Sequence, residues 1–272
     1  MGKALKVRCP AKINLTLKVI NKREDGFHNI ESIMQTINLY DYLTIKVSKS
    51  DSLNIKLDGN NCNIPYNENN LVYKAIKLYL ENVSIQPHKI SVYIEKNIPV
   101  SAGLAGGSTD AAGVLFGLNE LFDNLLSIEK LHGLCASLGS DLNVCLKGGK
   151  LMTRGRGEII EPMNFQKFRL SLIKPINLGI SAKEAYTKFS KLFYEEKINI
   201  NNRDSYLNDL EWAVINDYEQ LKKIKTAYPK AVMSGSGSSY FLINGEFKPM
   251  EGYWICNNLE AIDYGVSLDS FN

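Results

Sequence analysis

The sequence predicts a protein of the α+β class. In the first part of the chain, alternating apolar and polar residues predict strands over residues 6–17, 35–47 and 53–57. Apolar residues at helical spacing become frequent from Ala111 onward, and strand-like runs return in the second half. At 272 residues, the chain is long enough to bury a core as one large domain or as two modest ones.

The first helix is predicted over residues 70–80, and a strand follows it. In this strand Ile90, Val92 and Ile94 alternate with polar neighbours, which is the pattern of a half-buried strand. Pro99 then ends the strand, because proline has no backbone N–H to donate to a neighbouring strand.

Two more helices are predicted after a loop rich in glycine. The apolar positions of the first recur at helical spacing, and they are Ala111, Leu115, Leu118 and Phe122. Its start can be capped by any of three side chains that accept hydrogen bonds from backbone N–H groups: Ser108, Thr109 or Asp110. The second is predicted over residues 128–138, and one of its faces carries Leu131, Leu134 and Cys135.

A further pair of strands is predicted near residues 146–152 and 168–173. The segment Gly155-Arg-Gly-Glu158 separates them and has the composition of a turn. We place a domain boundary near Gly157, which divides the chain into an N-terminal domain, 1–157, and a C-terminal domain, 158–272.

The last part of the chain again mixes helices and strands. A helix is predicted to begin near Ser181, and a polar, Asn-rich linker over residues 198–204 leads to a helix over 210–228. A second turn rich in glycine and serine, within residues 232–243, then runs into a strand.

The composition is that of an ordinary globular protein. Hydrophobic residues make up 44% and charged residues 22%, and the formal charge of +3 is too small to indicate nucleic-acid binding. Five cysteines form no Cys-x-x-Cys pair, which disfavours a zinc site and fits reduced thiols in the cytoplasm. No apolar run is long enough for a signal peptide or a membrane span.

The stretch Pro99-Val-Ser-Ala-Gly-Leu-Ala-Gly-Gly-Ser-Thr-Asp-Ala-Ala112 is the feature that points to a nucleotide. Its roughly one dozen small residues exceed what a simple strand-to-helix connection needs. Gly103, Gly106 and Gly107 let the backbone approach a ligand, and the start of the next helix attracts an anion. The alternative is an ordinary turn before a helix, with no ligand bound. Walker, dinucleotide-fold and protein-kinase signatures do not occur in the sequence.

Three other segments carry candidate functional residues. On the strand at residues 9–15, Lys12 and Asn14 share a face, and the opposite face is apolar. The turn at residues 23–29 contains Phe27 and His28, and Asp141 follows a glycine at the end of a helix. Each has an alternative without a function in the site: a solvated lysine, a histidine in a turn, and an aspartate that caps a helix or belongs to a turn.

Taken in order, these segments resemble the GHMP kinase superfamily. Within it, the chain is most similar to the 4-diphosphocytidyl-2-C-methyl-D-erythritol kinase family, on the motifs Pro10-Ala-Lys-Ile-Asn-Leu, Arg23-Glu-Asp-Gly-Phe-His, Gly139-Ser-Asp-Leu, Gly155-Arg-Gly-Glu and Met233-Ser-Gly-Ser-Gly-Ser. The resemblance spans nearly the entire chain. It implies a two-domain α+β GHMP kinase fold with the active site in the interdomain cleft. It also implies ATP-dependent phosphorylation of the 2-hydroxyl of 4-diphosphocytidyl-2-C-methyl-D-erythritol in non-mevalonate isoprenoid biosynthesis.

The resemblance also implies roles for single residues. Asp141 matches the base that accepts the hydroxyl proton, and Lys12 matches the lysine beside that hydroxyl. Phe27 and Tyr186 match two aromatic residues that sandwich the cytosine, His28 matches the residue that bonds its edge, and Asn14 contacts the substrate. The residues implied to bind ATP are Asn70, Lys96, Pro99, Val100, Ser101, Ala102, Gly103, Leu104, Ala105, Gly106, Gly107, Ser108 and Thr109. ATP chemistry implies Mg²⁺, with Ser108 as its protein contact.

The chain departs from the family pattern at a few positions. Asn143 stands where a proline usually follows the catalytic aspartate, and Ala102 and Ala105 replace glycines of the loop. The residues between Gly149 and Gly155 also differ. Two other functions are alternatives: a GHMP kinase for a mevalonate-like, homoserine or sugar substrate, and a catalytically silent protein that binds ATP or another ligand.

Overall fold

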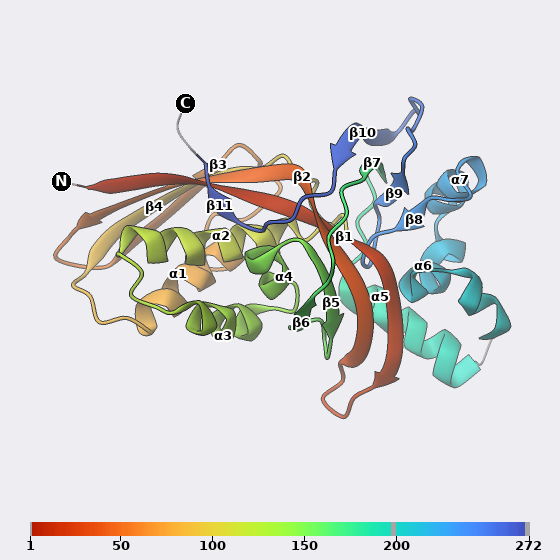
Figure 1. Ribbon diagram of the computed structural model, residues 1–272, viewed down its shortest axis with the longest axis horizontal. Helices are drawn as coiled ribbons and strands as arrows, with labels where there is room; N and C mark the ends of the chain where they lie inside the picture. The colour runs from red at the N-terminus through yellow and green to blue at the C-terminus, as the bar shows by residue number, and fades with distance from the viewer. Residues whose placement is uncertain (1, 197–199, 270–272) are drawn as a thin grey trace.

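The computed structural model describes residues 2–196 and 200–269, and these residues form two β-sheets covered by helices (Figure 1). The larger sheet has the strand order β11-β1-β2-β4-β3, with β5 paired to β2 and β6 paired to β5. Its strands are β1 (Lys3–Lys22), β2 (His28–Lys49), β3 (Asn54–Gly59), β4 (His88–Glu95), β5 (Lys150–Arg154), β6 (Ile159–Pro162) and β11 (Ser267–Leu268). The mixture of sheets and helices confirms the predicted α+β class.

The smaller sheet has the order β10-β7-β9-β8. Its strands are β7 (Arg169–Pro175), β8 (Val232–Met233), β9 (Tyr240–Ile243) and β10 (Tyr253–Glu260). The helices beside the larger sheet are α1 (Leu71–Glu81), α2 (Gly106–Leu121), α3 (Ile128–Leu138) and α4 (Leu142–Lys147). Those beside the smaller sheet are α5 (Ala182–Ser190), α6 (Asp209–Val214) and α7 (Glu219–Ala227).

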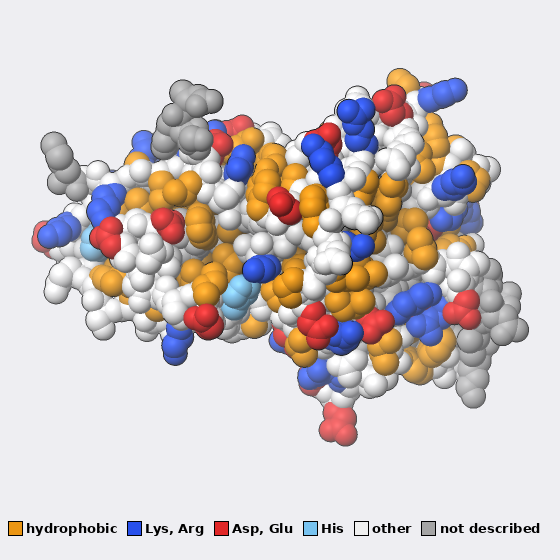
Figure 2. All heavy atoms as spheres, in the orientation of Figure 1, with side chains coloured by type: hydrophobic (Ala, Val, Ile, Leu, Met, Phe, Trp, Pro, Cys, Tyr) orange, Lys and Arg blue, Asp and Glu red, His pale blue; other side chains and the backbone are white. Residues whose placement is uncertain are grey.

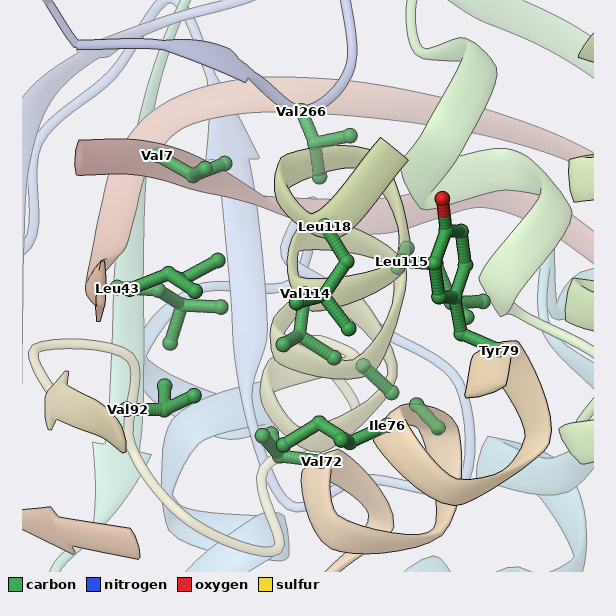
Figure 3. Close-up of a cluster of buried hydrophobic side chains, with 14 of the residues drawn as sticks. Val7, Leu43, Val72, Ile76, Tyr79, Val92, Val114, Leu115, Leu118 and Val266 are labelled. Atoms are coloured by element: carbon green, nitrogen blue, oxygen red, sulfur yellow. The ribbon is translucent and has the colours of Figure 1, made fainter. Parts of the chain in front are cut away.

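The main hydrophobic core lies between the larger sheet and helices α1 and α2. Figure 3 shows α2 with its side chains between those of the strands and those of α1. Two glycines let α2 lie close to the sheet. A Cβ on Gly113 would lie 2.3 Å from Cys9 Sγ, and one on Gly117 would lie 2.5 Å from Ile45 Cδ1. Any larger residue at these positions would therefore push the helix that follows the glycine-rich loop away from β1.

The long hairpin of β1 and β2 joins the two halves of the molecule (Figure 1). Its register shifts at three places, and such bulges bend a strand. The last part of β1 reaches the C-terminal half of the chain, where Leu17 N donates to Leu207 O at 2.8 Å and Val19 N donates to Asp209 Oδ2 at 2.7 Å. Lys12 and Asn14, in the middle of β1, therefore lie where the larger sheet meets the C-terminal half.

The structure corrects the predicted strand pair at 146–152 and 168–173. The first predicted strand begins too early: Leu146 and Lys147 belong to helix α4, in which Leu142 and Leu146 lie one turn apart and are both buried. Strand β5 starts only at Lys150. Strand β5 pairs with β2 and β6, whereas β7 belongs to the smaller sheet. The predicted boundary at Gly157 falls inside the β5–β6 hairpin, and the change of sheet comes between β6 and β7.

The predicted helix over residues 210–228 is interrupted. It consists of α6, a 3-10 turn at Ile215–Asp217, and α7, because Tyr218 has an extended backbone (φ −129°, ψ 109°). Residues 198 and 199 of the predicted Asn-rich linker lie outside the described residues, and Ile200–Ser205 forms a 3-10 helix. The helices predicted at 70–80 and 128–138, and the one predicted to begin near Ser181, are confirmed.

The surface bears out the scattered charge seen in the sequence. On the face drawn in Figure 2, Lys and Arg side chains are interspersed with Asp and Glu, and they form no broad patch of one sign. No helix in the described part of the chain is both long and apolar enough to cross a membrane.

Candidate active site

A cleft of about 1120 Å³ is lined by residues from both halves of the chain. It brings together most of the residues singled out in the sequence: Lys12, Asn14, Phe27, His28, Asn70, Lys96, residues 99–103 and 105–108, Asp141 and Tyr186. Leu104 and Thr109 do not line it. The Leu104 side chain packs in a hydrophobic cluster, and Thr109 is fully buried in α2.

Lys12 lies at the centre of this cleft and is almost fully buried, with 3% of its surface exposed. Its Nζ donates to Asn14 Oδ1 at 2.7 Å and to Gly103 O at 3.2 Å. The same atom lies 3.4 Å from Asp141 Oδ2. The alternative that Lys12 is a solvated surface lysine is therefore wrong, because the ammonium group is held among oxygen atoms inside the cleft.

Asn14 lies beside Lys12 on the same face of β1, as the alternation predicts. Its Oδ1 accepts from Lys12, and its Nδ2 donates to Ser32 Oγ at 2.8 Å. Both ends of the amide are therefore engaged, so Asn14 orients the lysine. Its contact with substrate stays a prediction.

Asp141 immediately precedes helix α4 and has a side chain 29% exposed to the cleft. Its carboxylate makes no capping bond to the helix, so the interpretation as a simple cap is wrong and the oxygens are left for other partners. The neighbouring Asn143 takes the place of the expected proline. Its side chain donates to Glu158 O at 3.0 Å and bonds His132 Nδ1 at 3.0 Å. These two bonds attach the start of α4 to the β5–β6 turn and to α3.

The glycine-rich loop is held from two sides at Gly103. The carbonyl of Gly103 accepts from Lys12 and, at 2.9 Å, from Ser234 Oγ. Gly103 has φ +73°, and a Cβ there would lie 2.0 Å from Ser234 O, so both the conformation and the space require glycine. The loop is thus fixed against β1 and against the C-terminal half at one residue.

Helix α2 begins at Gly106, earlier than the candidate caps suggested. Ala105 occupies the cap position in a left-handed conformation and provides no side-chain bond, and none of Ser108, Thr109 and Asp110 caps the helix. The first backbone N–H groups of this 16-residue helix therefore lack a side-chain cap, and Gly106, Gly107 and Ser108 line the cleft. Such a helix start favours a bound phosphate.

The second glycine- and serine-rich turn also belongs to the cleft, and the residue-level predictions missed it. Ser234 Oγ accepts from Asn14 N at 3.2 Å, and Gly235 and Ser236 line the cleft. Asn208 holds this turn by donating from Nδ2 to Met233 O at 2.7 Å and to Gly235 O at 2.8 Å. The sequence feature that indicates these residues is the run of small residues in Met233-Ser-Gly-Ser-Gly-Ser.

Lys96 also lines the cleft, and two carboxylates hold its ammonium group. Nζ bonds Asp41 Oδ2 and, at 2.9 Å, Asp110 Oδ2, and all three side chains are at most 4% exposed. Asp41 also accepts from Asn97 N at 2.6 Å and from Ile98 N at 2.8 Å. Burial raises the pKa of Asp41 and of Asp110, and the charge of Lys96 opposes this shift. The cluster thus connects the segment before the loop to α2.

Asn70 caps helix α1 and lies in the same cleft. Its Oδ1 accepts from Val72 N at 2.9 Å, and its Nδ2 donates to Pro65 O at 2.6 Å. The contacts of Asn70 and Lys96 with adenosine stay predictions.

At another part of the cleft, aromatic side chains lie on the tip of the β1–β2 hairpin and on α5. The ring of His28 stacks on Tyr186, with centroids 5.1 Å apart and planes 18° apart. Phe27 is 52% exposed, and Arg156 Cζ lies 5.0 Å from its ring centroid. The resemblance predicts a base between Phe27 and Tyr186. In this structure the ring of His28 lies against Tyr186. Arg156 was missed as a site residue, although its Gly-Arg-Gly-Glu turn was one of the motifs.

Comparison with known proteins agrees with this geometry. Residues 70–149 match the family described as GHMP kinases N terminal domain. The chain is 40% identical over 258 residues to the 4-diphosphocytidyl-2-C-methyl-D-erythritol kinase of Clostridium beijerinckii, covering 88% of this chain and 90% of the relative. A crystal structure of 4-(cytidine 5'-diphospho)-2C-methyl-D-erythritol kinase has a TM-score of 0.69 and 26% identity, over 96% of this chain and 99% of that one.

A more distant likeness supports the fold alone. The homoserine kinase structure from Cytophaga hutchinsonii has a TM-score of 0.70 at 17% identity, over 98% of this chain and 97% of that one.

The family match and the cleft together define a small-molecule kinase of the GHMP superfamily. The chain belongs to the 4-diphosphocytidyl-2-C-methyl-D-erythritol kinase family. It is an ATP-dependent enzyme of non-mevalonate isoprenoid biosynthesis, which confirms the predicted fold, family and enzyme class.

Proposed function

We propose that the enzyme transfers the γ-phosphoryl group of ATP to the 2-hydroxyl of 4-diphosphocytidyl-2-C-methyl-D-erythritol. The observation that carries this proposal is the pair of Lys12 Nζ and Asp141 Oδ2, which lie 3.4 Å apart in the cleft that also holds the glycine-rich loop. A protein that only binds nucleotide has no use for a carboxylate paired with a buried lysine in its cleft, so the pair favours catalysis over a silent binder.

The two side chains divide the chemistry between them. The substrate hydroxyl oxygen forms a bond to the γ-phosphorus as the bond from that phosphorus to the β–γ bridging oxygen breaks, and ADP leaves. Asp141 takes the hydroxyl proton. Lys12 stabilises the developing charge on the attacking oxygen.

The start of α2 and the loop before it are proposed to hold the triphosphate. The uncapped N–H groups from Gly106 onward supply donors. The hydrogen bond from Lys12 Nζ to the Gly103 carbonyl holds the loop next to Lys12. Ser108 is the residue that would hold Mg²⁺ from the protein side. Among the residues that the structure describes, no group of three or more acidic, His or Cys side chains could hold a metal ion. The ion would neutralise phosphate charge.

A panel of acceptors tests the proposed substrate. We expect ATP consumption with 4-diphosphocytidyl-2-C-methyl-D-erythritol and none above background with mevalonate or homoserine. Faster turnover with either of the latter would overturn the substrate assignment. No turnover with any acceptor would favour the silent binder.

Phe27→Ala is expected to weaken binding of the cytidyl substrate. Stacking on a base contributes about 1 to 3 kcal/mol, so its KM should rise about 5- to 100-fold while the KM for ATP stays nearly constant. Tyr93→Ala is the matched control, because Tyr93 is an exposed aromatic residue of β4 outside the cleft. A selective rise in the KM for ATP would place Phe27 beside adenosine instead.

His28→Ala is expected to relax the choice of base. A site that bonds the edge of a base rejects analogues that lack the matching group, so the ratio of kcat/KM between the cytidine and uridine substrates should fall toward one. His88→Ala on β4 is the control. An unchanged ratio would mean that His28 is only a turn residue.

We further propose a cytoplasmic location, which the free state of all five cysteines supports. The division into residues 1–157 and 158–272 likewise stays a proposal. Its support is that β7 to β10 form a sheet separate from that of β1 to β6.

A further inference from the structure

His28 is held by three residues of a single helix. Tyr186 stacks on its ring, and Phe189 meets the ring edge-on with centroids 6.5 Å apart. Ser190 Oγ lies 2.7 Å from His28 Nε2. These residues follow a spacing of three and four along α5, so one helical face presents all of them to the hairpin tip. The mechanism proposed above assigns no role to Ser190.

The surroundings keep the His28 ring neutral. Burial lowers its pKa below the ordinary value, and the charge of Lys22 lowers it further. A neutral imidazole carries its hydrogen on only one of its two nitrogens. Nε2 is engaged by Ser190, and within residues 2–196 and 200–269 no hydrogen-bond partner is found for Nδ1. His28 lines the cleft, and Nδ1 is the ring nitrogen without a partner among the described residues.

The hydroxyl of Ser190 has one available acceptor. Ser190 is 7% exposed, and a buried hydroxyl hydrogen that bonds nothing is costly. Among the described groups, His28 Nε2 is the partner found for Oγ. If Oγ accepted from Nε2–H, its own hydrogen would lack an acceptor. Donation from Oγ to Nε2 satisfies both atoms, and it places the ring hydrogen on Nδ1.

We propose that Ser190 is a positioning residue that holds His28 as the Nδ1–H tautomer for recognition of the base. An Nδ1–H complements N3 of cytosine, which is an acceptor, and opposes N3–H of uracil. The identity of the base rests on the proposed function. The tautomer does not, because it belongs to the free protein.

NMR of the free protein tests the tautomer directly. The chain has three histidines, so ¹⁵N-histidine labelling gives few ring signals, and His28→Gln identifies those of His28. We expect a protonated Nδ1 and an unprotonated Nε2. Ser190→Ala should move His28 toward the Nε2–H form, and Ser190→Thr should keep the wild-type pattern. A protonated Nε2 in the wild type would overturn the proposal.

Steady-state kinetics tests the consequence. A hydrogen bond contributes about 0.5 to 1.5 kcal/mol, so Ser190→Ala should raise the KM of the cytidyl substrate about 2- to 10-fold and narrow the cytidine-to-uridine ratio. The kcat and the KM for ATP should not change. Ser190→Thr should restore the ratio. Lys188→Ala, on α5 but outside the cleft lining, is the control for general damage to the helix.

The two proposals fail in different ways. If the wild type does not use the cytidyl substrate, the proposed function fails, and the NMR result still decides the tautomer. If the wild type is active but Ser190→Ala leaves both the tautomer and the base ratio unchanged, Ser190 does not position His28 and the inference is wrong.

Discussion

Asp141→Asn is expected to lower kcat by about 10²- to 10⁴-fold, because it removes the group proposed to accept the hydroxyl proton. The amide has nearly the same shape as the carboxylate, and the side chain makes no capping bond whose loss would disturb α4. The KM values for both substrates should therefore change little. Steady-state kinetics with ATP and the cytidyl substrate measures the effect.

Asp123→Asn is the matched control for this change. Asp123 has a side chain that is 84% exposed, and it pairs with Lys3 away from the cleft, so its variant should keep wild-type kcat. A loss of less than about tenfold for Asp141→Asn would show that positioning alone accounts for the rate and that Asp141 is not the base.

The short-range features of this site could be predicted from the sequence. Alternation along β1 places Lys12 and Asn14 on one face, and the run of small residues before α2 locates the loop. Both depend on neighbours in the chain, so a local pattern is sufficient to find them. The same holds for α1, because Asn70 provides its cap directly before an apolar helix.

Contacts between distant residues could not be found in this way. His28 and Ser190 are 162 positions apart, and Lys96 and Asp41 are 55 apart. The Lys96 assignment shows the difference. Its place in the cleft agrees with the prediction, but its two carboxylate partners depend on how β2 and α2 pack, and no local pattern contains that information.

The wrong secondary-structure predictions have a related cause. The predicted strand at 146–152 includes the last two residues of α4, because periodicity alone does not separate the end of a short buried helix from a strand. Packing against α2 and α3 decides the outcome. In the same way, β5 pairs with β2 rather than with β7 because the chain returns to the larger sheet, which is a property of the whole fold.

The Gly103 carbonyl shows why the site depends on both halves of the chain. It accepts from Lys12 on β1 and from Ser234 in the C-terminal turn, and Asn208 holds that turn in place. The position of the glycine-rich loop relative to Lys12 is therefore set by residues more than 100 positions away from Gly103 in sequence.

Lys12→Ala is expected to lower kcat about 10²- to 10³-fold, which is the typical effect of removing one donor aimed at charge that develops in the transition state. The substitution removes the cation proposed to lie beside the attacking oxygen. It also leaves Asn14 Oδ1 and the Gly103 carbonyl without their donor. Lys12→Met keeps most of the side-chain volume and should show a similar loss in kcat, which separates the effect of charge from that of a cavity.

The double variant Lys12→Ala/Asp141→Asn tests whether the two residues act as a unit. If Lys12 works by supporting the proton transfer to Asp141, the losses should not multiply, and the double variant should be about as slow as the slower single variant. Lys6→Ala is the control on the same strand, because Lys6 pairs with Glu95 and Asp269 outside the cleft. Fully multiplicative losses would mean that Lys12 acts on the phosphoryl group independently of Asp141.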